Sequence, residues 1–319
     1  MSPGRAREPG PLLDAARAGD RAALARLLSL VEQGDGAARA VGRLSYPLGG
    51  QAYAVGLTGA PGAGKSTLTS ALIGHLRARS LPVAVLAIDP TSPFSGGAIL
   101  GDRVRMQDHA TDPGVFIRSM ATRGQLGGLA LAVPEAIRLL DAVGKPWIIV
   151  ETVGVGQVEV EIAGQADTTV VVVNPGWGDG VQANKAGLME IADVFVINKA
   201  DRAGVAETRR DLELMLDLSD LGEWRPPILA AVATEGTGVA EVWEAVEGHR
   251  HVTEKSGSLA LRREERARRE LRQIVVQRLE ARARELCRGA TYVDLERAVL
   301  ERELDPWAAT DVLLGEVGA

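Results

Sequence analysis

The sequence has little cysteine, no excess of positive charge and no long apolar run, and each absence excludes a class of protein. Cys287 is the single cysteine, which excludes an intrachain disulfide framework and a site built from several cysteines around zinc or iron–sulfur. A formal net charge of -6 provides no general attraction for nucleic acid. No uninterrupted apolar segment suits a signal peptide or a spanning helix. We therefore expect a soluble, cytoplasmic protein that binds neither nucleic acid nor membrane.

Short runs of β-branched and apolar residues alternate with helical segments through the middle of the chain. Seven such runs predict strands, at residues 54–58, 83–89, 115–119, 147–151, 169–174, 194–198 and 228–232. Nearly all of them are fully apolar for four or more residues, which is typical of strands that are covered on both faces. The pattern predicts an α/β fold with a mainly parallel sheet between layers of helices.

Both ends of the chain are predicted to be helical. Residues 1–11 carry Gly, Pro and Arg without periodicity and are expected to form a disordered tail, and two short helices should follow up to Gln33, with Asp20 as the cap of the second. After Gly257 a long helix rich in Arg, Glu and Leu is expected, then two shorter helices. The mixed charges of its run 262–272 predict a solvated face. The predicted domains are an N-terminal helical extension at 1–48, a nucleotide-binding domain at 49–256 and a C-terminal helical arm at 257–319.

The strongest motif is a complete G-x-x-x-x-G-K-[ST] between a predicted strand and a predicted helix. It comprises Gly59, Ala60, Pro61, Gly62, Ala63, Gly64, Lys65 and Ser66. Glycines allow successive backbone N–H groups to surround phosphate, and the start of the following helix adds partial positive charge. Lys65 should bridge the β- and γ-phosphates, Ser66 should bind Mg²⁺, and Thr67 should extend the phosphate site. The motif predicts a P-loop NTPase.

A second motif, Asn198-Lys199-Ala200-Asp201, follows the sixth predicted strand. It has the N-K-x-D pattern of GTP-binding proteins. The carboxylate of Asp201 can accept hydrogen bonds from N1–H and the exocyclic amine of guanine, a donor pair that adenine lacks. Ala233 and Thr234, after the next strand, are candidates for backbone contact with the guanine oxygen. Together the motifs predict that GTP and GDP are the bound nucleotides.

Three acidic residues are candidates for the metal and for catalysis. Asp89 and Glu151 end two predicted strands, and Asp102 lies in a loop. Since the carboxyl ends of parallel strands share one edge of a sheet, these acids could converge on Mg²⁺ beside Ser66. A helix or turn cap is the alternative role for each. We also expect Lys65, Asp89 and Glu151 to take part in hydrolysis.

Two further loops are candidates for contact with the phosphates, and the first resembles a switch of GTPases with one departure. Glu151-Thr152-Val153-Gly154 has the acid-x-x-Gly form, but Val155 follows where many small GTPases place the Gln that orients water. A slow intrinsic rate, accelerated by a partner, is the resulting hypothesis. The Gly-rich stretch 176–180 is predicted to be a mobile loop, followed by Lys185. Lys185 could swing onto phosphate oxygens as a catalytic group or remain solvated on the surface.

Four stretches taken together resemble the MeaB/ArgK-type GTPases, which are associated with methylmalonyl-CoA mutase. They are GAPGAGKST, DPTSPFSGGAILGDRVRM, VETVGVGQVE and INKADR. The resemblance covers almost the whole chain, and GGAILGDR and ETVGVGQ are absent from ordinary small GTPases. The loop NPGWGDGVQANKAG, which carries Lys185, departs from the family's commoner GDELQ form.

The resemblance implies a homodimeric GTPase of the SIMIBI class with a dimerising C-terminal arm. It implies that the protein binds an adenosylcobalamin-dependent acyl-CoA mutase, gates delivery of the cofactor from an adenosyltransferase, and protects or reactivates the mutase. It places Ser66, Asp89, Asp102 and Glu151 at Mg²⁺ and switch positions, and Lys185 in a loop that contacts nucleotide when the mutase binds.

Two alternative functions compete with this one. A metal-insertion GTPase would carry Cys- or His-rich motifs, whereas only His249 and His251 lie close together here, in what we expect to be a solvated loop at a helix end. A P-loop small-molecule kinase would prefer ATP, against which the NKAD motif argues. Cys287 is expected to be a packing residue on the long helix.

Overall fold

The computed structural model describes residues 8–34, 36–89, 106–121, 126–152, 164–176, 190–219 and 222–315. The chain divides into two compact units, Met1–Glu264 and Glu265–Ala319. Among the described residues, no helix is both long enough and apolar enough to cross a membrane. The first unit carries the sheet and both nucleotide motifs.

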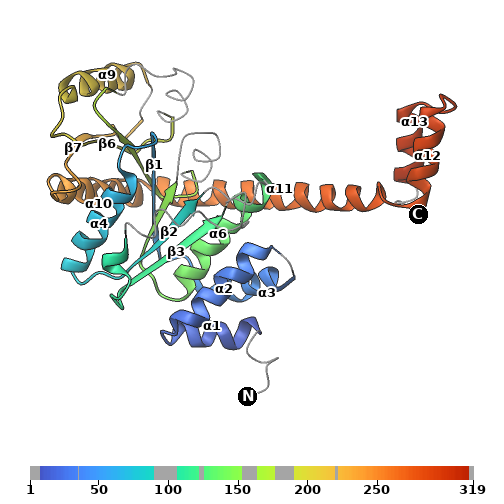
Figure 1. Cartoon of the computed structure of the whole chain (residues 1–319), viewed down its shortest axis with the longest axis horizontal. Helices are drawn as coiled ribbons and strands as arrows, with labels where there is room; N and C mark the ends of the chain where they lie inside the picture. The colour runs from blue at the N-terminus through green and yellow to red at the C-terminus, as the bar shows by residue number, and fades with distance from the viewer. Residues whose placement is uncertain are drawn as a thin grey trace. The chain divides into compact units, whose positions relative to one another are not determined.

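The first unit is built on a seven-stranded sheet in the order β3-β2-β4-β1-β5-β6-β7 (Figure 1). All strand pairs are parallel. The strands are β1 (Tyr53–Gly59), β2 (Val83–Asp89), β3 (Val115–Ala121), β4 (Trp147–Thr152), β5 (Thr168–Val173), β6 (Val194–Asn198) and β7 (Ile228–Ala231). Every predicted strand is confirmed. Every residue of β1, β4, β5 and β6 is buried, which explains their continuous apolar sequences.

Helices cover both faces of the sheet. On one face, α4 (Lys65–Ala78) and α10 (Val239–Ser256) pack over a core that includes Leu57, Leu72 and Trp243. The other face is covered by α6 (Leu126–Ala142) at the β2–β4 end and by α9 (Val205–Asp217) at the β5–β7 end. Residues that alternate along each strand enter opposite cores, so the two layers bury both faces.

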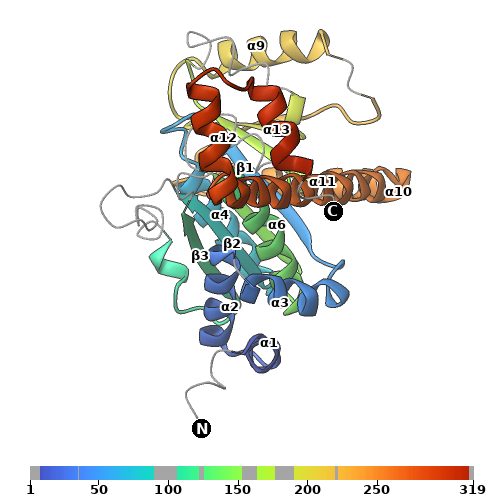
Figure 2. The ribbon, with the colours of Figure 1, turned by 90° about the vertical axis from the view of Figure 1, so that its right-hand side faces the viewer.

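Three N-terminal helices pack outside α6 and form a further layer (Figure 2). They are α1 (Pro9–Arg17), α2 (Arg21–Gln33) and α3 (Gly36–Ser45). Asp20 caps α2 as predicted, since its carboxylate accepts hydrogen bonds from the N–H groups of Ala22 and Ala23 at 2.8 and 3.1 Å. The predicted disordered tail extended to residue 11, and this was wrong for its last residues, since α1 begins at Pro9. Proline fits the first turn of a helix.

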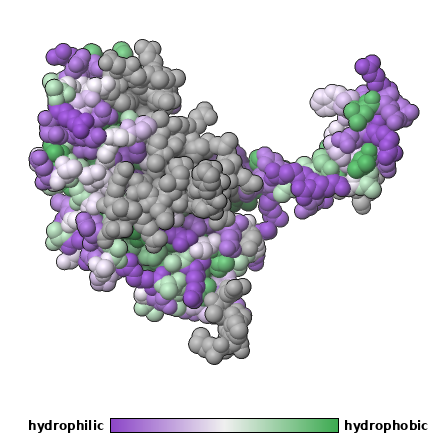
Figure 3. All heavy atoms as spheres, in the orientation of Figure 1, coloured by the Kyte–Doolittle hydropathy of each residue, from purple (hydrophilic) through white to green (hydrophobic). Residues whose placement is uncertain are grey.

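The predicted C-terminal helices are also present. They are α11 (Ser258–Leu286), α12 (Ala290–Leu300) and α13 (Pro306–Gly315), and α12 packs against α13. The second unit leaves many large apolar side chains exposed, visible in green on these helices in Figure 3. They are Leu271, Val275, Val276, Leu279, Val293, Leu300, Trp307, Val312 and Leu314.

Candidate functional site

The P-loop connects β1 to α4 through glycines that no other residue could replace without strain. Gly59, Gly62 and Gly64 have φ values of 136°, 71° and 90°, in the region that side chains disfavour. A Cβ on Gly59 would lie 1.9 Å from the carbonyl oxygen of Val172, and one on Gly64 would lie 2.3 Å from Nδ2 of Asn198. The loop therefore needs glycine both for its turn and for its close contact with β5 and β6.

Lys65 and Ser66 occupy the first turn of α4, directly after the loop. Both are buried, at 7% and 4% exposure, and Ala63 is fully buried beside them. The ammonium of Lys65 donates hydrogen bonds to the carbonyl oxygens of Gly59 and Ala60 at 2.8 and 3.0 Å, so it lies across the mouth of the loop. Lys65 and the N-terminus of α4 thus place two sources of positive potential at one point, as phosphate binding requires.

The guanine motif is fastened to the P-loop by its own side chains. Asn198 is the last residue of β6 and is 2% exposed. Its Nδ2 donates to the carbonyl oxygen of Ala63 at 2.8 Å, and its Oδ1 accepts from the N–H of Ala233 at 3.2 Å. Lys199 donates from Nζ to the carbonyl oxygen of Gly62 at 2.6 Å. One amide side chain therefore sets the spacing among three loops. The pattern N-K-x-D gave Asn198 no such role.

The other proposed guanine contacts lie next to these anchors. Asp201 is exposed beyond the end of β6, where a base could reach its carboxylate. Ala233 is buried and Thr234 is exposed, just after β7. The backbone N–H of Ala200 donates to the carbonyl oxygen of Ala231 at 3.0 Å, which holds the two loops together. Asp201 and Thr234 are thus presented on the same edge of the sheet as the P-loop.

Two of the three predicted metal-site acids lie on strands near β1, which leads into the P-loop: Glu151 is on the adjacent strand β4, and Asp89 is on β2, the next strand beyond it. Glu151 is 1% exposed, and its Cα lies in register with Leu57 of β1 and Ala87 of β2. Asp89 is the last residue of β2. Both are therefore at the carboxyl edge that carries Ser66. Asp102, Lys185 and the switch residues Val153, Gly154 and Val155 lie outside the described residues.

The oxygen donors at this edge fit Mg²⁺ by their chemistry. A hydroxyl from Ser66 and carboxylates from Asp89 and Glu151 are hard ligands, and Mg²⁺ in nucleotide sites takes only one or two of them besides phosphate and water. No group of three or more His, Cys, Asp or Glu side chains able to hold a metal is found in the part of the chain that the structure describes.

Two predictions outside the site were wrong. His249 does not lie in a solvated loop: it is 0% exposed inside α10, with Nδ1 2.8 Å from Oγ1 of Thr168. Only His251, on the other side of the helix, is exposed. Cys287 follows the last residue of α11 and is exposed, so it does not pack as expected. The sequence pattern of α10 does not predict that His249 is buried, because a polar side chain whose hydrogen bonds are satisfied can occupy a core position.

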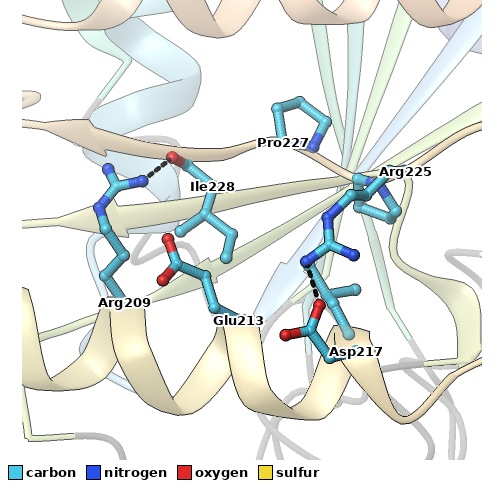
Figure 4. A pocket seen from close by; sticks show the side chains of 8 residues that line it. Arg209, Glu213, Asp217, Arg225, Pro227 and Ile228 are labelled. Carbon is cyan, nitrogen blue, oxygen red and sulfur yellow. Dashed lines mark hydrogen bonds and ion pairs between the residues drawn. The ribbon is translucent and has the colours of Figure 1, made fainter.

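A separate pocket of about 300 Å³ lies between α9 and the segment that leads into β7 (Figure 4). It opens at the amino-terminal end of β7, whereas the P-loop is at the carboxyl edge of the sheet. Both of its arginines are engaged: Arg209 donates to the carbonyl oxygen of Ile228 at 2.7 Å, and Arg225 pairs with Asp217 at 2.6 Å. This pocket is not part of the nucleotide site.

Comparison with known proteins agrees with the geometry. The family profile described as methylmalonyl Co-A mutase-associated GTPase MeaB matches residues 24–287. A protein of Pyrococcus abyssi that carries a GTPase name is 52% identical over 96% of this chain and 96% of its own. GTPase ArgK of Escherichia coli K12 is 40% identical over 76% of each chain. The mitochondrial methylmalonic aciduria type A homolog of Mus musculus is 35% identical over 82% of this chain and 65% of its own.

A solved structure has a similar fold. The crystal structure of LAO/AO transport system kinase superimposes with a TM-score of 0.72 and 29% identity, covering 100% of this chain and 99% of that one. The matching profile spans more than half of the chain, and the Pyrococcus abyssi relative covers it nearly from end to end. A P-loop whose spacing to an NKxD motif is fixed by hydrogen bonds thus belongs to a guanine nucleotide hydrolase, and the chain is a member of the MeaB family of mutase-associated GTPases.

Proposed function

We propose that the protein is a GTP-hydrolysing chaperone that gates adenosylcobalamin loading and protects or reactivates an acyl-CoA mutase such as methylmalonyl-CoA mutase. The observation that carries the nucleotide part is the hydrogen-bonded unit of P-loop and guanine motif, joined through Asn198. The family membership supports the mutase part. An adenosyltransferase that supplies the cofactor would be an indirect partner.

In the proposed site, the phosphates occupy the loop from Gly59 to Gly64, and Lys65 moves from the loop carbonyls to the β- and γ-phosphates. Its present hydrogen bonds to Gly59 and Ala60 keep the ammonium within reach of that position. Ser66, Asp89 and Glu151 would hold Mg²⁺, with Asp102 as a further candidate. When bound, Mg²⁺ would neutralise charge on the transferring phosphoryl group. Lys65 stabilises the same charge from the protein side.

Selection of guanine is assigned to Asp201, with backbone help from the loop after β7. The N–H of Ala233 already donates to Asn198, which leaves the next amide, that of Thr234, as the proposed donor to the guanine oxygen. Ala233 would then act by positioning this loop. Because Asn198 and Lys199 bind the P-loop, base and phosphate recognition are built on one hydrogen-bonded frame.

Hydrolysis is proposed to depend on the partner. Val155 directly follows Gly154, where many GTPases place the glutamine that orients water. The mutase would supply or organise the missing group, with Lys185 contacting nucleotide when it binds. Such a dependence converts a nucleotide site into a switch that reports whether the mutase is loaded.

A second copy of the chain is the other proposed partner. Leu271, Val275 and Leu279 are exposed and recur every four residues along α11, so they share one side of that helix. An apolar stripe of this kind normally packs against another helix. We propose that residues 257–319 form a dimerisation arm, that 49–256 form the GTPase domain and that 1–48 form a helical extension.

The direct test is protection of purified methylmalonyl-CoA mutase during turnover. Mutase activity should decay more slowly with the wild-type protein and GTP than with the mutase alone. Lys65→Ala should give no GTP-dependent protection, since it cannot hydrolyse GTP, whereas the exposed-site control Lys255→Ala should protect fully. Equal decay with and without the wild-type protein and GTP would reject the mutase role and leave a GTPase of another purpose.

A further inference from the structure

Two consecutive arginines in the first turns of α11 pair with two buried aspartates of the first unit. Arg263 forms a two-point contact with Asp167, from Nε to Oδ1 at 3.0 Å and from Nη2 to Oδ2 at 2.7 Å. Arg262 donates from Nη1 to Oδ1 of Asp193 at 3.0 Å. The side chains of the two aspartates are only 4% and 12% exposed. Charge-assisted pairs with buried carboxylates hold their geometry more firmly than exposed ion pairs do.

Both aspartates stand immediately before a strand and bind the start of its neighbour. Asp167 precedes β5, and its Oδ2 also accepts from the N–H of Ala54 in β1 at 3.0 Å. Asp193 precedes β6, and its Oδ2 accepts from the N–H of Thr169 in β5 at 2.8 Å. The two arginines are therefore joined to the amino ends of β1, β5 and β6.

These three strands carry the nucleotide site at their other ends. β1 runs into the P-loop at Gly59, β6 ends at Asn198 of the guanine motif, and β5 lies between them and pairs with both. Each has five to seven residues, so roughly 20 Å of extended backbone separates the two ends. Paired strands in the middle of a sheet transmit a displacement along their length, because their hydrogen bonds resist sliding.

A buried network leaves this junction little freedom. Nε2 of His249 lies 3.2 Å from Oδ1 of Asp193, and Nδ1 of the same ring lies 2.8 Å from Thr168. The indole N–H of Trp224 donates to the backbone oxygen of Asp193 at 2.7 Å. Arg263 also donates to the carbonyl oxygen of Ala52, just before β1, at 2.8 Å. Any shift of the start of α11 has to move the strand ends with it or break these bonds.

We propose that Arg262 and Arg263 are positioning residues for the GTP site, through which the start of α11 controls nucleotide affinity. They touch no nucleotide. They act through Asp193 and Asp167 on the strands that set the spacing of the P-loop and the guanine motif. The inference rests on the GTPase activity alone and stands whether or not a mutase is the partner.

The first test compares release of fluorescently labelled GDP from full-length Arg262→Gln and Arg263→Gln proteins with release from the wild type. Release should be at least about fivefold faster in both variants. The matched control is Arg79→Gln, which removes an exposed ion pair with Glu247 and touches no strand start; its release should match the wild type. Arg263→Lys keeps the positive charge and one hydrogen bond, so it should release GDP more slowly than Arg263→Gln does. Wild-type release in both glutamine variants would overturn the proposal.

The second test uses Trp224 as a reporter beside Asp193. In protein labelled with fluorotryptophan, the Trp224 resonance, assigned through Trp224→Phe, should differ between the GDP complex and that of a non-hydrolysable GTP analogue. The difference should persist in Arg79→Gln and disappear in Arg262→Gln, whose side chain is half exposed and whose loss should leave the fold intact. A loss of stability alone would not remove a nucleotide-dependent shift. The same Trp224 resonance in both wild-type complexes would overturn the coupling.

Discussion

At the scale of single residues, Asn198 is the centre of the site. Most of its importance comes from its contacts with other loops, since its amide joins the carbonyl oxygen of Ala63 to the N–H of Ala233. A buried amide with both ends satisfied fixes the distance between the groups it binds. Together with Lys199, which binds the carbonyl oxygen of Gly62, this side chain sets the spacing of phosphate and base recognition.

We expect Asn198→Ala to weaken GTP binding by about thirtyfold, because it removes two buried hydrogen bonds worth roughly 1 kcal/mol each. Isothermal titration with GTP measures the change. Ser219→Ala, which removes one exposed hydrogen bond at the end of α9, serves as the control. Affinity for GTP that is unaltered in Asn198→Ala would show that the loops keep their spacing without this residue.

Tyr53 gives a prediction about pH. Burial raises the pKa of Tyr53 to about 12, although its hydroxyl lies 2.7 Å from Oγ1 of Thr168. An unfolded chain ionises its tyrosines near pH 10, so the neutral native phenol stabilises the fold below about pH 10 and loses that contribution as pH rises toward about 12. Tyr53→Phe should be less stable at pH 7 by about 1 kcal/mol. The difference in the free energy of unfolding between Tyr53→Phe and the wild type, measured by urea unfolding, should become smaller above about pH 10. A difference that stays constant would contradict the raised pKa.

Residue patterns predicted the P-loop and guanine motifs because each has fixed spacing. They missed the contacts between distant positions. The run 262–272 reads as a solvated charged face, yet Arg262 and Arg263 pair with aspartates far away in the sequence. The solvated histidine prediction failed at His249 for the same reason, since its partners Thr168 and Asp193 come from other elements.

At the scale of elements, all seven strands were predictable from runs of apolar residues, because a parallel sheet covered on both faces needs such runs. The helical caps were predictable where a short polar residue precedes the helix, as at Asp20. The start of α1 was not, because a proline-rich segment is also typical of a tail. Strand order depends on long-range pairing, which the local pattern does not contain.

Removing the cap of α2 tests the contribution of the N-terminal layer. Asp20→Ala should destabilise the protein by about 1 kcal/mol, because the N–H groups of Ala22 and Ala23 lose their acceptor. Asp14→Ala, an exposed site within α1, should have little effect. Urea unfolding measures the free energy of unfolding of both variants. Equal stability of the two variants would show that the cap contributes nothing.

At the scale of the whole molecule, the second unit exposes many large apolar side chains and has almost no core of its own. Only Ala309 is buried among its described residues beyond Glu264. A helical segment with so much exposed leucine and valine is stabilised by association. This supports the proposal that two copies of the chain pair through residues 257–319.

The double variant Leu271→Glu with Leu279→Glu should shift the protein toward monomer, because two charges would enter the proposed apolar interface. Light scattering coupled to size-exclusion chromatography measures the mass. Leu218→Glu, at an 89% exposed position after α9, should leave the mass unchanged. If Leu218→Glu loses the dimer, or if the double variant remains dimeric, the dimer interface does not lie on this side of α11.

The central claim is that Asp201 reads guanine on a P-loop frame, and nucleotide selectivity tests it most directly. Hydrolysis of GTP and XTP should be compared in the wild type and in Asp201→Asn, with Asp14→Asn as the control. Asparagine offers xanthine an amide donor and denies guanine its paired acceptor. The account predicts that the GTP-over-XTP preference falls by at least about a hundredfold in Asp201→Asn and not in the control. An unchanged preference for GTP in Asp201→Asn would contradict it.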